Sequence, residues 1–138
     1  MAFSTDANLE LVLPAVFKYG ITSFDEYHPL AEAEVVRDIR KFWIPRQYIV
    51  SLADFDMTKL RHPDWTRANC YRLLGWHILP RLATETEVSG FRAMMNDYKK
   101  MYDDELSDVI DNGVMYDTGS GYVRIPTTPA AESQRIWR

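Results

Sequence analysis

The most constraining feature of the sequence is a long apolar repeat that ends in a helix-stop signal. Its apolar side chains recur at steps of three and four residues, which is the spacing of one face of an α-helix. The repeat comprises Val88, Phe91, Met95, Tyr98, Tyr102, Leu106 and Val109. Asn112 and Gly113 follow it, and glycine is favoured just beyond a helix end. The pattern predicts a helix of about 26 residues, about 39 Å long, that begins near Glu85.

Three shorter helices are predicted upstream, because each apolar stretch is bounded by a capping residue or a proline. The first follows Thr5 and ends near Pro14. The second spans about 29–44 and carries a proline in its first turn, where a helix tolerates it. The third spans about 64–79, and its apolar residues extend beyond one face, so we expect it to be the most buried helix.

Two stretches do not fit long helices. Residues 46–63 contain dispersed aspartates and a proline, and we predict a loop with a short helix near 58–61. Glycines at 119 and 121 and prolines at 126 and 129 exclude a helix after Gly113. The 138 residues fit one domain. The predicted fold is all-α: a small bundle of about four main helices over 1–121, with a long last helix and an extended C-terminal arm over 122–138.

Composition narrows the function classes. The net charge is −4, and the basic residues do not form a dense cluster along the sequence, which argues against nucleic-acid binding. Cys70 is the single cysteine, no apolar window approaches a membrane span, and the N-terminus has no signal-peptide pattern. We therefore expect a soluble protein of a reducing compartment. The net charge alternates along the chain: it is negative over 1–36 and 82–117 and positive over 37–81 and 118–138. This alternation fits self-association or an oppositely charged partner. It equally fits the solvated faces of helices.

One string resembles a catalytic motif. Asp117-Thr118-Gly119-Ser120 matches the motif of aspartic proteases, in which two such aspartates share one proton. A single copy would therefore work only as a homodimer. That fold is all-β and lies mostly after the motif, whereas here helices precede it and a short segment follows. We interpret Asp117 as a turn residue and keep the homodimeric protease as an alternative.

The sequence contains no other pattern typical of a metal site or a catalytic nucleophile. His28, His62 and His77 lie in separate elements without metal-ligand spacing, and His77 fits a hydrogen-bonded histidine of a buried helix. Cys70 lies among apolar neighbours, where a thiol is usually inert. The acidic run at 103–105 lacks the glycine of a calcium loop and fits a solvated helix face. We expect no enzyme, no cofactor and no metal.

The order of motifs resembles one protein family. A helix opens with Thr5-Asp6-x-x-Leu9, and a Pro-x-x-Phe-x-Tyr-Gly segment at 14–20 follows it. The buried helix is patterned Trp65, Ala68, Tyr71, Leu74, Ile78, Leu79, Pro80 and Leu82, and the long helix runs into Asp-Asn-Gly-Val-Met-Tyr-Asp at 111–117. This arrangement resembles the small head–tail connector (adaptor, or head-completion) proteins of tailed bacteriophages.

The resemblance implies a structural virion protein rather than an enzyme. Such proteins assemble as a ring, typically of twelve copies, beneath the portal protein, where they extend the DNA channel and dock the next neck or tail component. DNA would pass without sequence-specific binding, and no membrane would be involved. The protein would be made in the host cytoplasm and reside at the head–tail interface. The alternative is a generic helical interaction or regulatory module.

The family's C-terminal arm often reaches the portal, and it carries over to residues 122–138. Trp137 lies between two arginines, and tryptophan and arginine dominate binding hot spots. We expect this arm to bind a partner and to contribute little to the monomer core; the alternative is that Trp137 folds back onto its own bundle. The predicted partner-binding residues are Tyr122, Ile125, Arg135, Ile136, Trp137 and Arg138.

Overall fold

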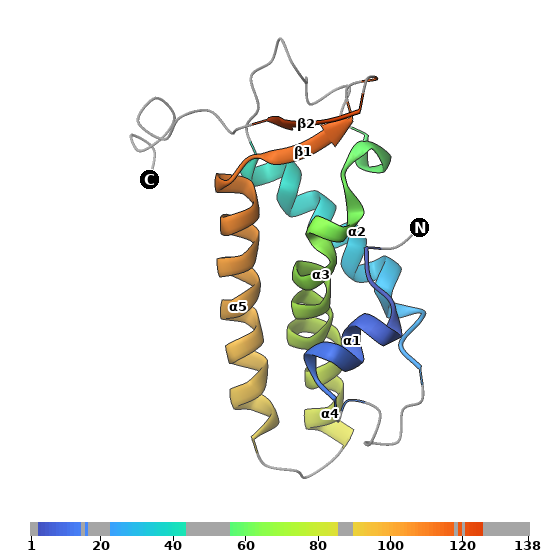
Figure 1. Cartoon of the computed structure of the whole chain (residues 1–138). Coiled ribbons are helices and arrows are strands. Elements are labelled where there is room, and N and C mark those ends of the chain that lie inside the picture. Colours follow the sequence, from blue (N-terminus) through green and yellow to red (C-terminus); the bar gives the residue numbers. More distant parts are fainter. Residues whose placement is uncertain are drawn as a thin grey trace, which may run out of the picture.

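The structure is a computed structural model, and it describes residues 3–14, 16, 23–43, 56–85, 90–117, 119 and 121–125. Within those residues the chain forms a bundle of helices, and a two-stranded antiparallel hairpin covers one end of the bundle (Figure 1). The predicted helical bundle is confirmed. The hairpin is an addition that the helical periodicity did not predict.

The first two helices follow their sequence signals closely. Helix α1 spans Asp6–Val12, and the side chain of Thr5 caps it by accepting a hydrogen bond from the backbone N–H of Asn8. Asn8 returns the contact by accepting from the Thr5 N–H at 2.9 Å, which completes a capping box. Helix α2 spans Tyr27–Phe42 and buries one side chain in every turn. Its buried residues are His28, Ala31, Val35 and Ile39.

The predicted third helix is longer than expected, because it does not end before Pro80. It comprises a 3₁₀ turn η4 (His62–Trp65), helix α3 (Thr66–Leu73), a π-helical turn η5 (Leu74–Ile78) and helix α4 (Leu79–Glu85). In the π turn the N–H of Leu79 donates to the carbonyl of Leu74, five residues earlier. Proline has no N–H, and in an α-helix its ring clashes with the carbonyl four residues back. The wider turn gives the ring room and lets the helix continue.

The long helix starts later than predicted. Helix α5 spans Phe91–Asp111, whereas Glu85, the predicted start, belongs to α4. Gly90 precedes α5 with a φ of 96°, a left-handed conformation that favours glycine. The predicted apolar face is confirmed at Phe91, Tyr102 and Leu106, which are buried, whereas Met95, Tyr98 and Val109 are only partly buried. The acids at 103, 104, 108 and 111 are exposed, as expected for a solvated face.

The hairpin corrects the predicted boundary of the C-terminal arm. Strand β1 (Val114–Asp117) pairs with strand β2 (Tyr122–Ile125), so that Val114 lies opposite Ile125. Ile125 is only 1% exposed, and its carbonyl accepts a hydrogen bond from the Trp43 indole at 3.3 Å. The prediction that the arm contributes little to the core is therefore wrong for Ile125, whereas Tyr122, Val123 and Arg124 are exposed. Residues 126–138 lie outside the described residues.

The segment before η4 also contacts this hairpin. A 3₁₀ turn η3 (Met57–Lys59) lies where a short helix is predicted near 58–61, but it begins one residue earlier and ends two residues earlier. Leu60 then forms a β-bridge with Tyr116, and the N–H of Asp56 donates to the Tyr116 hydroxyl at 3.0 Å. Residues 46–55 of the predicted loop lie outside the described residues.

Two apolar clusters divide the core along the bundle. The cluster at the hairpin end joins α2, η4, α5 and both strands, and its largest members are Trp43, Trp65 and Tyr102. The other cluster joins α1, α2, the π turn, α4 and the start of α5. Its members include Leu9, Phe24, Leu74, Leu79 and Phe91.

Gly75 marks the closest approach of the π turn to α5, and it provides a test of that packing. A Cβ atom at this position would lie 3.2 Å from the Lys99 Cγ and 3.3 Å from the Lys99 backbone nitrogen. Glycine to alanine in a helix normally stabilises by about 1 kcal/mol. Here we expect Gly75→Ala to lower the free energy of unfolding by about 1–3 kcal/mol, because the added methyl group overpacks the contact. Denaturant-induced unfolding would measure it.

Ser107→Ala is the matched control, because Ser107 is exposed on α5. It should leave the free energy of unfolding within about 0.5 kcal/mol of the parent value. A Gly75→Ala protein that is more stable than the parent would contradict the close packing of the two helices.

Candidate functional site

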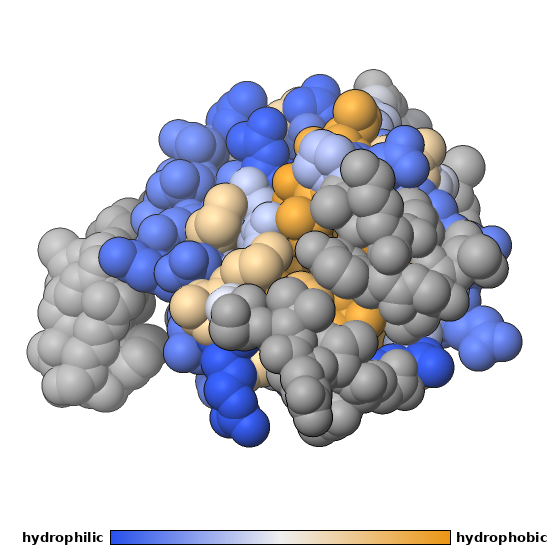
Figure 2. All heavy atoms as spheres, turned by 90° about the horizontal axis from the view of Figure 1, so that it is seen from below, coloured by the Kyte–Doolittle hydropathy of each residue, from blue (hydrophilic) through white to orange (hydrophobic). Residues whose placement is uncertain are grey.

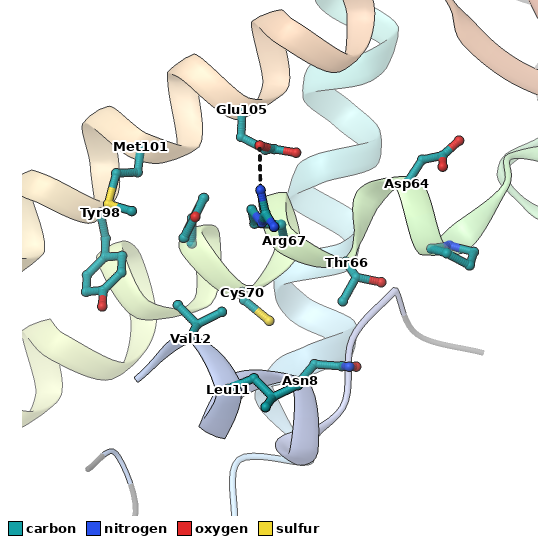
Figure 3. Close-up of a pocket in the computed structure, with 12 residues that line it drawn as sticks. Asn8, Leu11, Val12, Asp64, Thr66, Arg67, Cys70, Tyr98, Met101 and Glu105 are labelled. Atoms are coloured by element: carbon teal, nitrogen blue, oxygen red, sulfur yellow. Dashed lines mark ion pairs between the residues drawn. The ribbon is translucent and has the colours of Figure 1, made fainter. Parts of the chain in front are cut away.

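An open groove runs between α1, α3 and α5 (Figure 3). Its volume is about 540 Å³. Helix α1 contributes Asn8, Leu11 and Val12; the segment 63–71 contributes Pro63, Asp64, Thr66, Arg67, Cys70 and Tyr71; and α5 contributes Tyr98, Met101 and Glu105. The groove therefore depends on three segments that are far apart in the sequence.

Apolar side chains stand exposed on opposite walls of this groove. Leu11 on α1 is 82% exposed and Met101 on α5 is 40% exposed. From the end of the bundle opposite the hairpin, apolar surface lies among hydrophilic residues (Figure 2). Covering apolar surface contributes about 25 cal/mol per Å² removed from water. A partner that covers both walls would therefore gain affinity from these side chains.

The polar rim of the groove consists of surface ion pairs. Arg67 on α3 lies 4.0 Å from the Glu105 carboxylate on α5 and reaches across the groove. Asp64 accepts three hydrogen bonds from the Arg61 guanidinium, one at 2.9 Å and two at 3.0 Å. Exposed pairs of this kind contribute at most about 1 kcal/mol. They can rearrange when a partner binds.

The outer edge of the groove on α5 is acidic. Asp97, Asp104 and Asp108 follow one another at steps of seven and four residues, and all three are exposed. This spacing places them along the helix stripe that also carries Met101. The groove therefore combines an apolar interior with a negatively charged border.

Cys70 lies at the floor of the groove and is fully buried. Burial raises the pKa of its thiol to about 11, so the thiol stays protonated at neutral pH. The nucleophile and the metal ligand are the thiolate form. This environment supports the interpretation of Cys70 as an unreactive packing residue.

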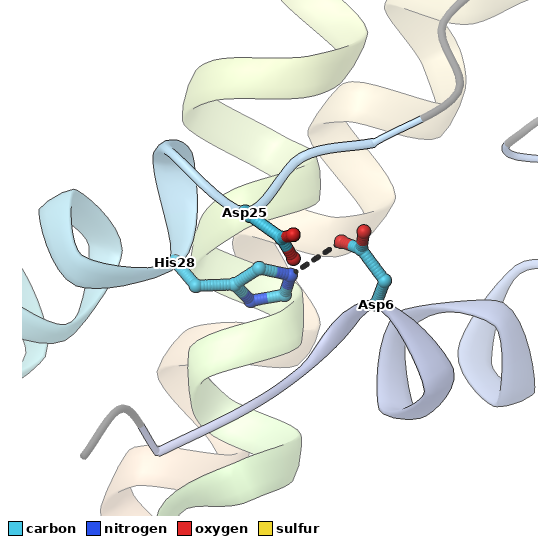
Figure 4. Close-up of side chains that lie close together, drawn as sticks. All are labelled: Asp6, Asp25 and His28. Carbon is cyan, nitrogen blue, oxygen red and sulfur yellow. Dashed lines mark hydrogen bonds and ion pairs between the residues drawn. The ribbon is translucent and has the colours of Figure 1, made fainter.

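Asp6, Asp25 and His28 form a second candidate site (Figure 4). One ligand atom from each lies within 4.8 Å of the others, a separation that a divalent cation could bridge. The His28 Nε2 atom, however, lies 2.9 Å from the Asp6 carboxylate. The same carboxylate accepts hydrogen bonds from the Ser23 hydroxyl at 2.9 Å and the Phe24 N–H at 3.2 Å.

These contacts set the protonation of Asp6. Burial by itself raises the pKa of this carboxyl group, but the hydrogen bonds from His28, Ser23 and Phe24 outweigh burial and hold the pKa below its ordinary value. A cation would have to replace the bond between His28 and Asp6. The contacts are better explained as an anchor that fastens the start of α1 to the start of α2.

A chain of buried polar side chains extends this anchor to α3. The Asn69 amide donates to the Ser4 hydroxyl at 2.7 Å, and Ser4 lies 2.7 Å from the His28 Nδ1 atom. Ser4, His28 and Asp6 thus have the order of a hydrolase triad, in which serine must reach a substrate. Ser4 is only 3% exposed, and two neighbours already engage its hydroxyl. The chain therefore holds helices together.

Arg72 organises a third polar cluster between α2, α3 and α5. Its Nε donates to Glu34 at 2.9 Å, and its Nη1 lies 3.6 Å from Asp38. Its guanidinium stacks over the Trp76 ring, 4.1 Å from the centroid. The Tyr102 hydroxyl donates to Asp38, and burial raises the pKa of this tyrosine above its ordinary value.

The same cluster contains His77, whose Nε2 lies 2.7 Å from Glu34. This contact confirms the prediction of a hydrogen-bonded histidine. Burial alone raises the pKa of Glu34, but the bonds from His77 and Arg72 outweigh it and hold the pKa below its ordinary value.

The depressed pKa makes a testable contribution to acid stability. The unfolded pKa of a glutamate is about 4.3, and the folded value of Glu34 lies below it. Its stabilising contribution is therefore complete at neutral pH and is lost as the pH falls through the folded pKa. At pH 7 we expect Glu34→Gln to be less stable by about 1–3 kcal/mol, because hydrogen bonds to a charged group weaken. Thermal unfolding at several pH values would measure it.

The decisive measurement is the difference in the free energy of unfolding between the parent protein and Glu34→Gln at each pH. It should shrink below about pH 4, where the parent loses the charge that the glutamine lacks. Two stability curves that stay parallel down to pH 3 would contradict a depressed pKa.

The protease-like aspartate belongs to the hairpin turn. Asp117 is the last residue of β1, and its Oδ1 accepts a hydrogen bond from the Gly119 N–H at 2.9 Å. Gly119 and Gly121 adopt positive φ values of 108° and 111°. An aspartate that accepts from the backbone two residues on is a turn former. The interpretation of Asp117 as a turn residue is confirmed.

The predicted partner-binding residues divide into three groups. Tyr122 is 48% exposed at the start of β2, as a partner-binding residue should be. Ile125 is buried in the core, so the role predicted for it is wrong. Arg135, Ile136, Trp137 and Arg138 lie outside the described residues.

Sequence reasoning missed the groove residues. Tyr98 belongs to the apolar repeat of the predicted long helix, but no sequence pattern states that this helix face meets Val12 on α1. The available signal is Leu11, which follows Leu9 in a short helix with apolar residues on more than one face.

Within the described part of the chain, no helix combines the length and the apolar character needed to cross a membrane. Comparisons with protein-family models, with curated proteins and with solved structures gave no match.

Proposed function

We propose that this chain is a structural protein of a tailed-bacteriophage virion, a head–tail connector that forms a ring beneath the portal. The proposal starts from the order of motifs along the sequence, from the Thr5 cap to the turn at 111–117. The observation that carries it is the groove between α1, α3 and α5, with Leu11 and Met101 exposed on opposite walls. A monomer gains nothing from this exposure, whereas a subunit of an assembly covers it.

The polar clusters favour a structural role. Ser4, His28 and Asp6 direct their polar atoms at one another, and Glu34 and Asp38 are engaged by Arg72. Catalytic groups need access to a substrate and a geometry that leaves room for it. Here the same side chains join helices.

The solvated face of α5 away from the groove fits a channel through which DNA passes. Exposed carboxylates at 103 and 111 repel phosphates, so a wall that carries them would not retain the strand. The ring would present other faces to the portal protein and to the next neck or tail component. By its resemblance to the family, such a ring would hold about twelve copies.

The state of the purified chain tests this proposal. Native mass spectrometry and negative-stain images should be recorded for the chain alone and with a candidate portal protein. We expect closed rings of one copy number, at least in the presence of the portal. A monomer that binds no portal would contradict the proposal and favour a generic interaction module. Peptide cleavage that disappears in Asp117→Asn would favour the protease alternative.

A further inference from the structure

We propose that the groove between α1, α3 and α5 receives residues 126–138 of a second copy of the chain. This inference deepens the proposed function, since it names the contact that would join neighbouring copies. The Trp137 side chain would enter the apolar interior, and Arg135 and Arg138 would lie beside the acidic border.

The interior of the groove fits a large apolar side chain. Leu11, Met101, Tyr71 and Tyr98 line it, and its volume of about 540 Å³ lies in the range of sites that enclose a ligand of several rings. A tryptophan side chain offers the largest apolar area of any residue, and it has a ring N–H that needs a polar partner. Glu105 supplies acceptor oxygens in the lining of the same groove.

The charges of the border and of the segment are complementary. Asp97, Asp104 and Asp108 are exposed along the outer edge of the groove. In residues 126–138 one arginine precedes Ile136 and Trp137 and one follows them. The single acidic residue of this segment, Glu132, lies three residues before the first arginine. An aromatic anchor with flanking arginines is the composition that dominates binding hot spots.

The position of Ile125 favours a second copy over the segment's own groove. The Trp43 indole at the end of α2 donates to the Ile125 carbonyl, so the segment departs from beside α2. Figure 3 shows α2 behind α3, on the side away from the groove. Thirteen extended residues span at most about 45 Å, which is enough to reach a neighbouring subunit.

The insertion of residues 126–138 into the groove of a second copy, called the exchange below, has a consequence for assembly. The groove and the segment are different surfaces of the chain, so each single contact is head-to-tail; two copies that insert their segments into each other would close a dimer, whereas copies that each pass the segment to the next one continue. Contacts of the second kind close into a ring when the rotation between copies allows it. They would therefore generate the type of assembly proposed above.

Photo-crosslinking of the full chain tests the occupant directly. Benzoylphenylalanine would replace Ile136, and equal amounts of ¹⁵N-labelled and unlabelled protein would be mixed, dissociated and reassembled before irradiation. We expect crosslinks from residue 136 to peptides that contain 8–12 or 98–105. About half of them should join a heavy peptide to a light one. Crosslinks only within one isotope would mean that the chain binds its own segment, and crosslinks to other surfaces would place the segment elsewhere; either result overturns the proposal.

Two substitutions test the energetics, with sedimentation velocity as the measure of self-association. Trp137→Ala and Met101→Arg should each weaken self-association by about 30-fold or more, the effect of losing a hot spot. Leu30→Arg is the control, because Leu30 is 54% exposed on α2 and outside the groove, and it should assemble as the parent does. Circular dichroism would verify that each variant is folded. Parent-like assembly of Trp137→Ala would overturn the proposal.

The two proposals fail separately. If heavy–light crosslinks form in the groove but the assembly is not a ring and binds no portal, the exchange stands and the connector function fails. If rings form with the portal but residue 136 crosslinks to no groove peptide, the connector function stands and the exchange fails.

Discussion

Replacing Arg72 by alanine is expected to lower the free energy of unfolding by about 3–5 kcal/mol, because it removes one partner from a buried charged cluster. Arg72 bonds to Glu34, lies beside Asp38 and stacks on Trp76. Its loss leaves two partly buried carboxylates without their guanidinium and uncovers the face of an indole ring. Urea-induced unfolding followed by tryptophan fluorescence at pH 7 would measure the change.

Arg67→Ala is the matched control for this experiment. Arg67 lies on the same helix, but its side chain is 67% exposed and its ion pair with Glu105 spans 4.0 Å. Its replacement should cost less than about 1 kcal/mol. Arg72→Met separates charge from packing, since methionine keeps much of the apolar stem. Equal losses for Arg72→Ala and Arg67→Ala would contradict a buried cluster.

Replacing Phe91 by alanine is expected to lower the free energy of unfolding by about 3–5 kcal/mol as well, because it leaves a cavity in the core. Phe91 opens α5 and is only 2% exposed within the cluster formed with α1, the π turn and α4. The neighbouring helices fix the walls of that space, so collapse would recover only part of the lost contact. Thermal and denaturant unfolding would measure the loss.

Phe42→Ala provides the comparison within the same chain. Phe42 ends α2 and is 52% exposed, so its truncation removes little buried area. We expect its effect to stay below about 1 kcal/mol. A Phe91→Ala protein that melts at the parent temperature would mean that α5 does not present this face to the core.

The helices were predictable because their signals are local. The Thr5 cap, the proline near the start of α2 and the three- and four-residue steps of α5 each act within one or two turns. The ends of the helices were harder to predict than their existence. The continuation through Pro80 depends on a π turn, and the start of α5 depends on Gly90, neither of which an apolar repeat reveals.

The hairpin was missed although its signal is present. Val114 and Tyr116 alternate with less buried residues, and a glycine-containing turn separates them from Val123 and Ile125. Such a pattern predicts a hairpin. The string Asp117-Thr118-Gly119-Ser120 by itself predicts only the turn.

The candidate sites depend on contacts between distant segments, which explains why the sequence did not predict them. Asp6 and His28 are 22 residues apart, and Glu34 and Arg72 are 38 residues apart. No periodicity encodes such pairs. The groove requires α1, α3 and α5 to be positioned first, and only then does the exposure of Leu11 become informative.

The hairpin also determines when the molecule can finish folding. Val114, Tyr116 and Ile125 complete the cluster that buries Trp43 and Trp65. During synthesis the ribosome releases α2 and α3 long before it releases these strands. The Trp43 ring, which packs against Tyr116 and donates to the Ile125 carbonyl, therefore lacks these two neighbours until residue 125 has joined the fold. A chain arrested before the hairpin would expose this tryptophan to chaperones and to other nascent chains.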